Sequence, residues 1–572
     1  MVQIPSFEGM QYSRDGTQAE KQDYAYFNEQ YATSTYQVDH NMYPDLIVQP
    51  KGDEDVIKAV IWARDNKVAI AVKSGGHQYS GASSTSGKNI QMDLSNTYKD
   101  LMVLNPHDPI DQDRALVYVG VSNQLKELNT YLKHNQLFVP HGDCAYVCVG
   151  GHGQTGGYGQ LGRGFGLFGD HIRTIRMICH DGAIRDISKE NDFELFYAIL
   201  GGSPGNFGII SHYTVEVYQA KSYMGTIASP NGFKGPHGIK GFWIYSPKVL
   251  KKLLTAVAQM ADNAKVPRGF DLTVNVLSTD FPIAMLFPTL NNANLWEHIQ
   301  NKIKNALADE FLEWLNGRFP AVIIVNAQWC PTSKKDKYDE SVDQWFNKFR
   351  ALKSFFENET LLIDEFEEDM SRMTGRWILP RRREFDLPYV KRTYSTNSKS
   401  LEKDGWVDLV IDRIDLIYNP RQLLDNNPGD KEYEVYTHCK LVTQIQCFGG
   451  ANSHFYLNKD NGTSYSWRDT SVVQTLDCFH ELGDKYKEYA EKWQAKNDSM
   501  MVGPSSPFSK QDRRLLWGSY GDWDLGKQEV WEYYYEDADK YQKLGRARGK
   551  ADPNGTFTAN LFAVSAIETK GA

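Results

Sequence analysis

A cluster of histidines and cysteines in the first third of the chain has the residue types of a metal site. His141, Cys144, Cys148 and His152 are side chains that coordinate zinc, and two, three and three residues separate them. Helical spacing would bring the last three onto one face, but a glycine pair within the stretch disfavours a helix. A zinc-binding protein with a site carried by a loop is therefore one interpretation of these residues.

The same cluster lies in a segment that is unusually rich in glycine. Between Gly142 and Gly169, 11 of 28 residues are glycine, against 46 of 572 in the whole chain. Gly157, Gly159 and Gly162 fit the G-x-G-x-x-G pattern of dinucleotide-binding proteins. That pattern requires a strand before it and a helix after it, and further glycines follow here instead. The flanking sequence argues against a Rossmann site and leaves a plain glycine-rich linker as an alternative.

A cofactor cradle is the remaining interpretation of this segment. Consecutive glycines allow main-chain N–H groups to point at a phosphate or a flat ring system. A second loop of this kind, KSGGHQYSG at residues 73–81, follows a predicted buried strand, and a third, GGSPGNFG, occupies residues 201–208. Three such loops at the strand ends of one domain suggest a large dinucleotide that threads between them.

The elements that must position these loops follow from the hydrophobic pattern. Val56, Ile57, Val60 and Ile61 form one apolar stripe, which predicts a helix over residues 53–64 between two short strands, a βαβ unit. A second helix is predicted at 123–134. The predicted strands of this part are 44–50, 68–72, 90–94, 115–121, 137–140, 172–179 and 209–218.

A shift toward Gly, Pro, Ser and Lys at residues 219–241 predicts a domain boundary. Beyond it the pattern alternates between long helices and strands, which indicates an α+β domain. The predicted helices are 247–263, 294–315, 334–356, 480–494 and 528–548. The predicted strands are 321–327, 407–417, 435–447 and 472–478.

Composition excludes several classes of protein. Lys and Arg number 63 and Asp and Glu 72, so a net charge of −9 disfavours nucleic-acid binding. No apolar run is long enough to span a bilayer, and seven cysteines in 572 residues argue against a disulfide scaffold. The first ten residues lack the features of a signal peptide, as expected of a cytoplasmic protein or of a secreted one without its leader.

Several motifs together resemble one family, the berberine-bridge-enzyme-like branch of the covalent flavoprotein oxidases. The loop at residues 73–81 is similar to the family's R/K-S-G-G-H-x-Y-x-G, and CAYVCVGGH at 144–152 to its C-P-T-V-G-x-G-G-H. The resemblance covers residues 44–218 well. Further similar segments are GLFGD at 166–170, GNFGII at 205–210, GSYGDWDL at 518–525 and DPNGTF at 552–557.

The resemblance implies an α+β fold of the vanillyl-alcohol-oxidase type. We expect a two-part FAD-binding domain at residues 1–220, with its core at 40–218. A substrate domain at 221–510 would have an antiparallel sheet covered by helices, and a C-terminal segment at 511–572 would return to the FAD domain.

The resemblance also implies a bicovalent FAD, attached through His77 and Cys144. Cys148 stands where the family has glycine, which leaves open which of the two cysteines carries the second bond. His152 matches a histidine that hydrogen-bonds the flavin side chain. The other expected cofactor-binding residues are Lys73, Ser74, Gly75, Gly76, Gln78, Val147, Gly151, Gly156, Gly157, Tyr158, Asp170, Gly205, Asn206, Gly208 and Ile209.

The implied activity is that of an oxidase that takes a hydride from a CH–OH group and passes the electrons to dioxygen, giving hydrogen peroxide. Tyr520 matches the family's base, and because a tyrosine pKa is near about 10, either a cationic partner or the flavin environment must lower that pKa. Gln474 and Asp477 are candidate helpers on the strand at 472–478, and Val147 would leave room for dioxygen.

The expected substrate is a mono- or oligosaccharide, and the alternative is a secondary metabolite such as an alkaloid or polyketide. We therefore expect a small-molecule substrate and dioxygen as partners, without nucleic acid or membrane. The oligomeric state stays open at this point.

Overall fold

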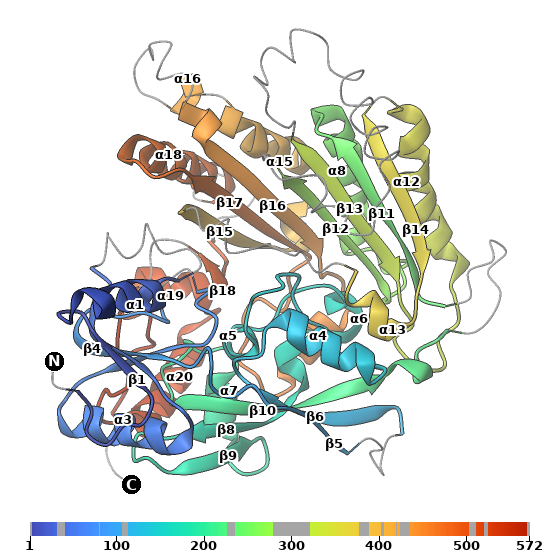
Figure 1. The fold of residues 1–572 in the computed structure, drawn as a ribbon. Helices are drawn as coiled ribbons and strands as arrows, with labels where there is room; N and C mark the ends of the chain where they lie inside the picture. Colours follow the sequence, from blue (N-terminus) through green and yellow to red (C-terminus); the bar gives the residue numbers. More distant parts are fainter. Residues whose placement is uncertain are drawn as a thin grey trace.

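The computed structural model contains three sheets in two parts (Figure 1). Its helices, strands and side chains are described for most of the chain. The described residues are 3–30, 41–78, 81–105, 112–225, 235–277, 321–357, 359–376, 388–401, 405–418, 420–423, 435–502, 511–519 and 524–568.

The first sheet has four strands in the order β1 (Met10–Ser13), β2 (Pro44–Gln49), β4 (Gly87–Asp93), β3 (Ile70–Lys73). Helix α3 (Asp53–Asp65) connects β2 to β3, and its buried face includes Val56 and Val60. The predicted βαβ unit is therefore present. Strand β4 lies between β2 and β3 and is parallel to both.

The second sheet is antiparallel and is centred on β10 (Ile209–Gln219). Its order is β5 (Leu101–Asn105), β6 (Arg114–Gly120), β10, β8 (Ile172–Ile178), β9 (Ile184–Ser188), and β7 (Leu137–Phe138) also pairs with β10. Helices α4 (Leu125–His134) and α7 (Phe193–Ile199) belong to the same part of the molecule. The first two sheets share one hydrophobic core.

The third sheet has eight strands and forms the upper part in Figure 1. Its order is β14 (Thr360–Glu367), β11 (His237–Ile244), β13 (Val322–Trp329), β12 (Phe270–Leu277), β16 (Cys439–Cys447), β17 (Val472–His480), β15 (Tyr389–Thr396), β18 (Arg514–Ser519). Every pair is antiparallel. One face packs against α8 (Pro247–Ala261), α12 (Asp343–Phe355), α15 (Trp406–Asp415) and α18 (Asp484–Met501).

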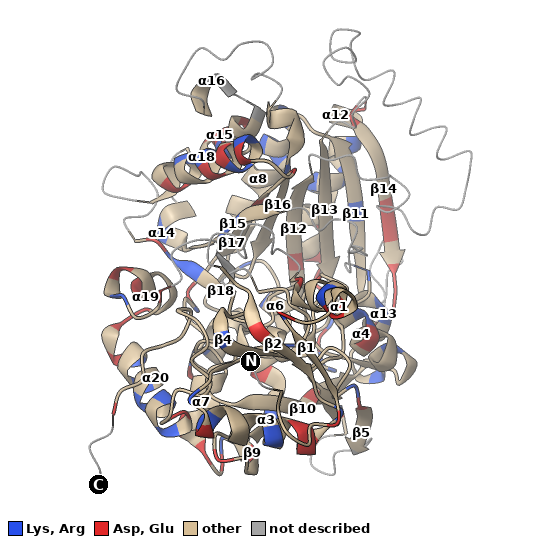
Figure 2. Ribbon diagram, turned by 60° about the vertical axis from the view of Figure 1, so that its left-hand side comes forward, with Lys and Arg blue, Asp and Glu red and all other residues tan. Residues whose placement is uncertain are grey.

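Charged residues gather on the outer helices, such as α18 and α20 (Ala538–Ala551), whereas β13 contains none (Figure 2). The opposite face of the third sheet points toward the first two sheets (Figure 1). Within the described residues, no helix has the length and apolarity needed to cross a membrane.

The C-terminal residues connect the two parts. Strand β18 extends the third sheet, and after it come α19 (Gln528–Tyr534) and α20. Helix α20 packs against α7, and the main-chain N–H of Ile70 donates to the carbonyl oxygen of Thr556 at 2.7 Å. The segment around Thr556 therefore lies against the first sheet.

Several predicted elements differ from the structure. Residues 407–417, predicted as a strand, form helix α15, because Trp406, Val410 and Ile414 recur at helical spacing and are buried together. The helix predicted at 528–548 is two helices, since Asp537 accepts from Lys540 N–H and starts α20 anew. The helix predicted at 334–356 begins only at Asp343. The helix predicted at 294–315 lies outside the described residues.

The glycine pair at 150–151 does not prevent a helix. Residues Val149–Gln154 form the short helix α5. Gly150 is buried there, and a Cβ at this position would lie 2.9 Å from Cβ of Val121. The helix forms because glycine lets it pack closely against the segment around Val121. This close packing outweighs the low helix propensity of glycine.

Candidate active site

A cavity lies between the glycine-rich loops and the third sheet. It encloses about 1660 Å³ of empty space, part of it open to solvent. The lining from the loops, which we call the floor, comes from parts of the segments 74–78, 142–158 and 204–208, so all three glycine-rich loops reach one site. The lining from the sheet, which we call the roof, comes from β12, β15, β16, β17 and β18.

Close packing holds the three loops together. A Cβ at Gly75 would lie 3.0 Å from Sγ of Cys148, so the first loop rests directly on the second. The main-chain N–H of Gly205 donates to Oε1 of Gln154 at 2.8 Å, which connects the third loop to α5. Because α5 is bonded or packed to both other loops, it organises the floor.

His77 and Cys144 both line this cavity, and both are half-buried. Cys148 is different, because its side chain is buried and its Sγ donates to the carbonyl oxygen of Ser122 at 3.4 Å. Burial raises the pKa of the Cys148 thiol to about 12, so it stays protonated. Of the two cysteines, Cys144 is therefore the more exposed to the cavity.

His152 on α5 is half-buried and lines the cavity. Burial lowers its pKa to about 3, so the ring is neutral at ordinary pH. Its Nε2 accepts from the main-chain N–H of Gly142 at 3.0 Å, which places the ring proton on Nδ1. His152 therefore offers one N–H donor to a ligand.

The zinc interpretation finds no support in the geometry. Both ring nitrogens of His141 are engaged: Nε2 accepts from Asn129 at 3.1 Å and Nδ1 donates to the carbonyl oxygen of Gly142 at 2.8 Å. In the described part of the chain, no three His, Cys, Asp or Glu side chains converge to hold a metal ion.

Some predicted cofactor-binding side chains point away from the cavity. Nζ of Lys73 donates to the carbonyl oxygens of Phe27 and Glu29 at 2.7 and 2.8 Å, and it lies 3.4 Å from Asp93. Asn206 donates to the carbonyl oxygen of Phe557 at 2.8 Å. Gly156, Asp170 and Ile209 are also not among the residues that line the cavity. The remaining predicted residues line it, namely Ser74, Gly75, Gly76, Gln78, Val147, Gly151, Gly157, Tyr158, Gly205 and Gly208.

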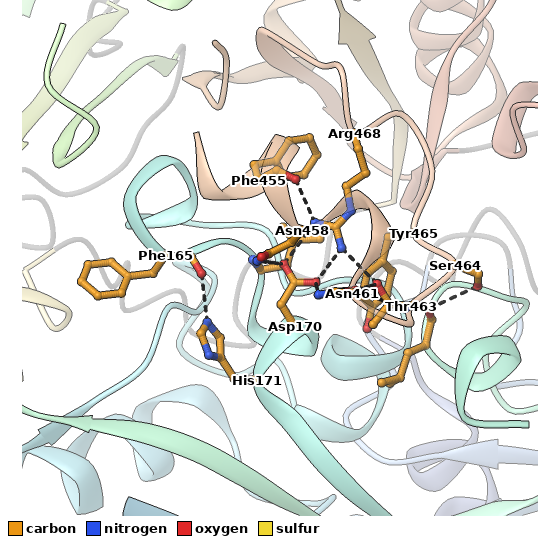
Figure 3. Close-up of polar contacts among 12 residues, drawn as sticks. Phe165, Asp170, His171, Phe455, Asn458, Asn461, Thr463, Ser464, Tyr465 and Arg468 are labelled. Carbon is orange, nitrogen blue, oxygen red and sulfur yellow. Dashed lines mark hydrogen bonds and ion pairs between the residues drawn. The ribbon is translucent and has the colours of Figure 1, made fainter. Parts of the chain in front are cut away.

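Asp170 instead forms a buried ion pair with Arg468, which precedes β17 (Figure 3). Arg468 donates to both carboxylate oxygens, at 3.0 and 2.5 Å, and Asn458 and Asn461 add bonds of 3.0 and 2.8 Å. Burial alone would raise the pKa of Asp170, but the Arg468 charge and these hydrogen bonds lower it below its usual value. Asp170 thus connects the glycine-rich segment to the third-sheet part of the chain.

The roof presents polar side chains that the sequence analysis did not single out. In the sequence, only the alternation of successive side chains between the two faces of a strand could identify them. That alternation helps only once the face toward the cavity is known. Trp517 of β18 adds an aromatic face. The polar groups are Asn275, Lys391, Gln444, Gln446 and Thr475.

The same alternation separates the two candidate helpers on β17. Asp477 lines the cavity, as do Val473 and Thr475. Gln474 points to the helix-covered face, where it donates to Thr396 at 2.6 Å and accepts from Arg413 at 3.1 Å. Tyr520 lies outside the described residues, three positions after Trp517.

The residues of the floor fit a dinucleotide such as FAD. A Cβ at Gly151 or Gly205 would have no heavy atom within 4 Å. Both glycines line the cavity and therefore expose their main chain to it.

Comparison with known proteins agrees with this geometry. Residues 44–188 match the FAD binding domain family FAD_binding_4. The uncharacterized FAD-linked oxidoreductase YvdP of Bacillus subtilis is 30% identical over 180 residues, which are 32% of this chain and 38% of that protein. Berberine bridge enzyme-like 12 of Arabidopsis thaliana is 33% identical over 177 residues, 30% of this chain and 32% of that protein. The matched region thus spans about a third of these relatives' length.

Solved structures match over the whole chain at low identity. A glucooligosaccharide oxidase from Acremonium strictum aligns with a TM-score of 0.66 at 15% identity and 99% coverage of both chains. The 6-hydroxy-D-nicotine oxidase of Arthrobacter nicotinovorans aligns with a TM-score of 0.66 at 16% identity, with 99% of this chain and 100% of that chain covered.

Together these findings define a flavoprotein fold with a PCMH-type FAD-binding domain, and they confirm the predicted fold class. The predicted resemblance to the berberine-bridge-enzyme-like proteins of the vanillyl-alcohol-oxidase fold is likewise confirmed.

Proposed function

We propose that this protein is an FAD-dependent oxidase that oxidises a CH–OH group of a mono- or oligosaccharide and reduces dioxygen to hydrogen peroxide. One observation carries the proposal. His77 and Cys144, on separate loops, face one cavity beneath a roof of polar side chains. The relatives named FAD-linked oxidoreductases support the oxidoreductase class.

His77 and Cys144 are the residues that would hold the cofactor, through a ring nitrogen and a sulfur. When bound, FAD accepts a hydride from the substrate carbon and passes the electrons to dioxygen. Two attachments would hold the cofactor in a cavity that is open enough for a bulky substrate. His152 would offer its Nδ1–H to the cofactor, and Val147 on the floor would leave room for dioxygen.

Proton removal from the substrate hydroxyl falls to Tyr520 and Asp477. Tyr520 has this role by resemblance, and Asp477 is the carboxylate that the roof places at the cavity. A base must come within hydrogen-bond reach of the hydroxyl that it deprotonates.

The roof suits a neutral, hydroxyl-rich substrate. Its amide, hydroxyl and charged groups can donate to and accept from several hydroxyls at once, and the Trp517 ring offers a stacking face. Structures of oligosaccharide oxidases among the fold neighbours support this substrate class. A secondary metabolite such as an alkaloid or polyketide is the alternative.

The test has two steps. Purified protein should be yellow, and the colour should survive acid precipitation, because the flavin is covalently bound. A peroxide-detection screen should then respond to neutral sugars. A response only to alkaloid or polyketide alcohols would replace the substrate class, and colourless protein with stoichiometric zinc would overturn the proposal.

A further inference from the structure

The roof places a lysine and a carboxylate side by side above the cavity. Lys391 on β15 and Asp477 on β17 are direct cross-strand partners, and Nζ of Lys391 lies 3.2 Å from Oδ2 of Asp477. Their side chains are only 5% and 4% exposed. Both residues line the cavity, so the pair is buried from bulk solvent but adjacent to the substrate space.

Trp517 fixes the position of the ammonium group. Nζ of Lys391 lies 4.7 Å from the centroid of the Trp517 ring on the neighbouring strand β18. An aromatic face attracts a cation at this distance. Lys391 is therefore held on one side by a carboxylate and on another by an indole, which leaves its charge little freedom to move.

Stability alone does not explain this pair. A buried ion pair contributes little beyond what packed apolar side chains of similar volume would contribute. Lys391 and Asp477 both line the cavity, so this ion pair lies where a bound substrate would contact it.

Other titratable groups face the pair across the cavity or lie behind it. Those of the floor are His77, Asp143, Cys144, Cys148, His152 and Tyr158. Of these, Asp143 accepts from Gln444 at 2.8 Å and His152 is neutral. On the far face, Arg392 pairs with Asp498 and Arg413 bonds to Gln474. Among the described lining residues, Lys391 is the one lysine or arginine.

We propose that Lys391 is a positioning residue of the reaction, whose ammonium keeps Asp477 ionised so that the carboxylate can receive the substrate's hydroxyl proton. The proposal rests on the proposed function. In the balanced step, the substrate O–H bond breaks and its proton goes to the Asp477 carboxylate. The C–H hydrogen leaves with its electron pair to the bound FAD, which is reduced, and the C=O bond forms.

The consequence is a defined pH dependence. A cation within about 4–6 Å lowers the pKa of a carboxyl group by about 1–3 units, whereas burial without a cation raises it. With Lys391 in place, Asp477 accepts a proton down to mildly acidic pH. Without Lys391, Asp477 is protonated at a higher pH. The acid limb, that is, the fall of kcat/KM on the acidic side of its pH profile, therefore moves to higher pH.

The experiment compares three full-length, flavin-loaded variants over pH 5–9. Lys391→Met should move the acid limb up by about 1–3 pH units and lower kcat/KM about tenfold or more at pH 6. Lys391→Arg keeps the charge and should retain the wild-type limb.

Arg392→Met is the matched control. Arg392 is the next residue on β15, is also buried, and pairs with Asp498 at 2.9 Å on the opposite, helix-covered face. This variant should lose thermal stability but keep the wild-type pH profile. An unmoved acid limb in Lys391→Met, or the same shift in Arg392→Met, would overturn the proposal.

Asp477→Asn tests the same step if Lys391→Met fails to fold. The amide keeps the shape but cannot take up a proton, so kcat/KM should fall by about 10²–10⁴ with flavin content unchanged. A wild-type pH profile of kcat/KM in Asp477→Asn would contradict the inference. Wild-type protein without flavin, or without activity on any alcohol, would instead refute the proposed function itself.

Discussion

At the scale of single residues, burial separates Cys144, which the family motif favours, from Cys148, which left that choice open. Both cysteines line the cavity, but Cys144 is half-buried, whereas Cys148 is buried against Gly75 and its pKa is raised to about 12. A sulfur that must form a bond needs both access and a thiolate. Its partial exposure at the cavity therefore favours Cys144 over the buried Cys148.

Replacing each cysteine separately gives the first prediction. Cys144→Ala should keep a yellow colour through acid precipitation by way of His77, but its flavin spectrum should change because the sulfur substituent is lost. Cys148→Ala should keep the wild-type spectrum. The measurement is absorbance after acid precipitation and resolubilisation, and a spectrum altered only in Cys148→Ala would reverse the assignment.

The second prediction concerns dioxygen. Val147 lines the cavity near Cys144, and Val147→Leu would fill space that we assign to dioxygen. Reoxidation of the reduced protein should slow about tenfold or more, equivalent to about 1.4 kcal/mol in the barrier. Stopped-flow reoxidation measures this, and anaerobic reduction by substrate is the internal control. Equal slowing of both half-reactions would mean that Val147 only packs the loop.

At the scale of elements, the segment from Gly162 to His171 joins the two parts of the molecule. Arg163 in α6 (Gly162–Phe165) donates to the carbonyl oxygens of Val266 at 3.0 Å and Phe270 at 3.2 Å, before and within β12. In the opposite direction, Arg468 reaches down to Asp170 (Figure 3). Two reciprocal contacts through buried arginines therefore fix the roof over the floor.

The third prediction tests this joint. Arg468→Met leaves Asp170 buried without its cation and should lower the free energy of unfolding by about 3–5 kcal/mol. Lys550→Met is the control, because Lys550 and Glu194 form an exposed pair at 2.6 Å, and its loss should cost under about 1 kcal/mol. Urea unfolding at pH 7 measures both. Similar losses in the two variants would contradict a special role for the joint.

The elements also show which sequence patterns are informative. Strands and helices with a clear period, such as α3 and β17, were predicted close to their observed bounds. Helix α15 was predicted as a strand because its β-branched residues obscured the helical period of its buried face. Helix α5 is not evident from the sequence, because the low helix propensity of glycine is outweighed by close packing that only the tertiary structure reveals.

At the scale of the whole molecule, motif-bearing loops could be predicted and the surface opposite them could not. The residues of loops 73–81 and 201–208 and the segment 142–169 predicted one shared site, and the structure brings them together. Lys391, Gln444 and Trp517 come from distant segments, and nothing local marks them as neighbours. Asp170 is the opposite case. It belongs to a recognisable motif, GLFGD, but in the structure it forms an ion pair with Arg468 and does not line the cavity.

The fourth prediction concerns acid stability of the fold. His171 is buried, its Nε2 donates to the carbonyl oxygen of Phe165 at 3.1 Å, and burial lowers its pKa to about 4 (Figure 3). Below about pH 6.5 this histidine is protonated in the unfolded chain but stays neutral in the folded chain. The free energy of unfolding therefore falls as the pH drops toward 4. At pH 5 this histidine should cost about 2 kcal/mol relative to pH 7.

His171→Gln removes the titration and retains a donor for Phe165. Its unfolding free energy should therefore change less between pH 7 and pH 5 than that of the wild type, by about 2 kcal/mol. Urea unfolding at the two pH values is the measurement. An identical pH dependence in variant and wild type would show that His171 does not contribute to acid destabilisation.

Mass spectrometry of flavin-bearing peptides tests the central claim most directly. After acid denaturation and proteolysis, the peptide that contains His77 and the peptide that contains Cys144 should be recovered joined through one flavin. Their combined mass should equal both peptides plus the flavin, less the hydrogens lost in forming two bonds. Unmodified His77 and Cys144 peptides from yellow, active protein, or protein without any flavin, would contradict the account.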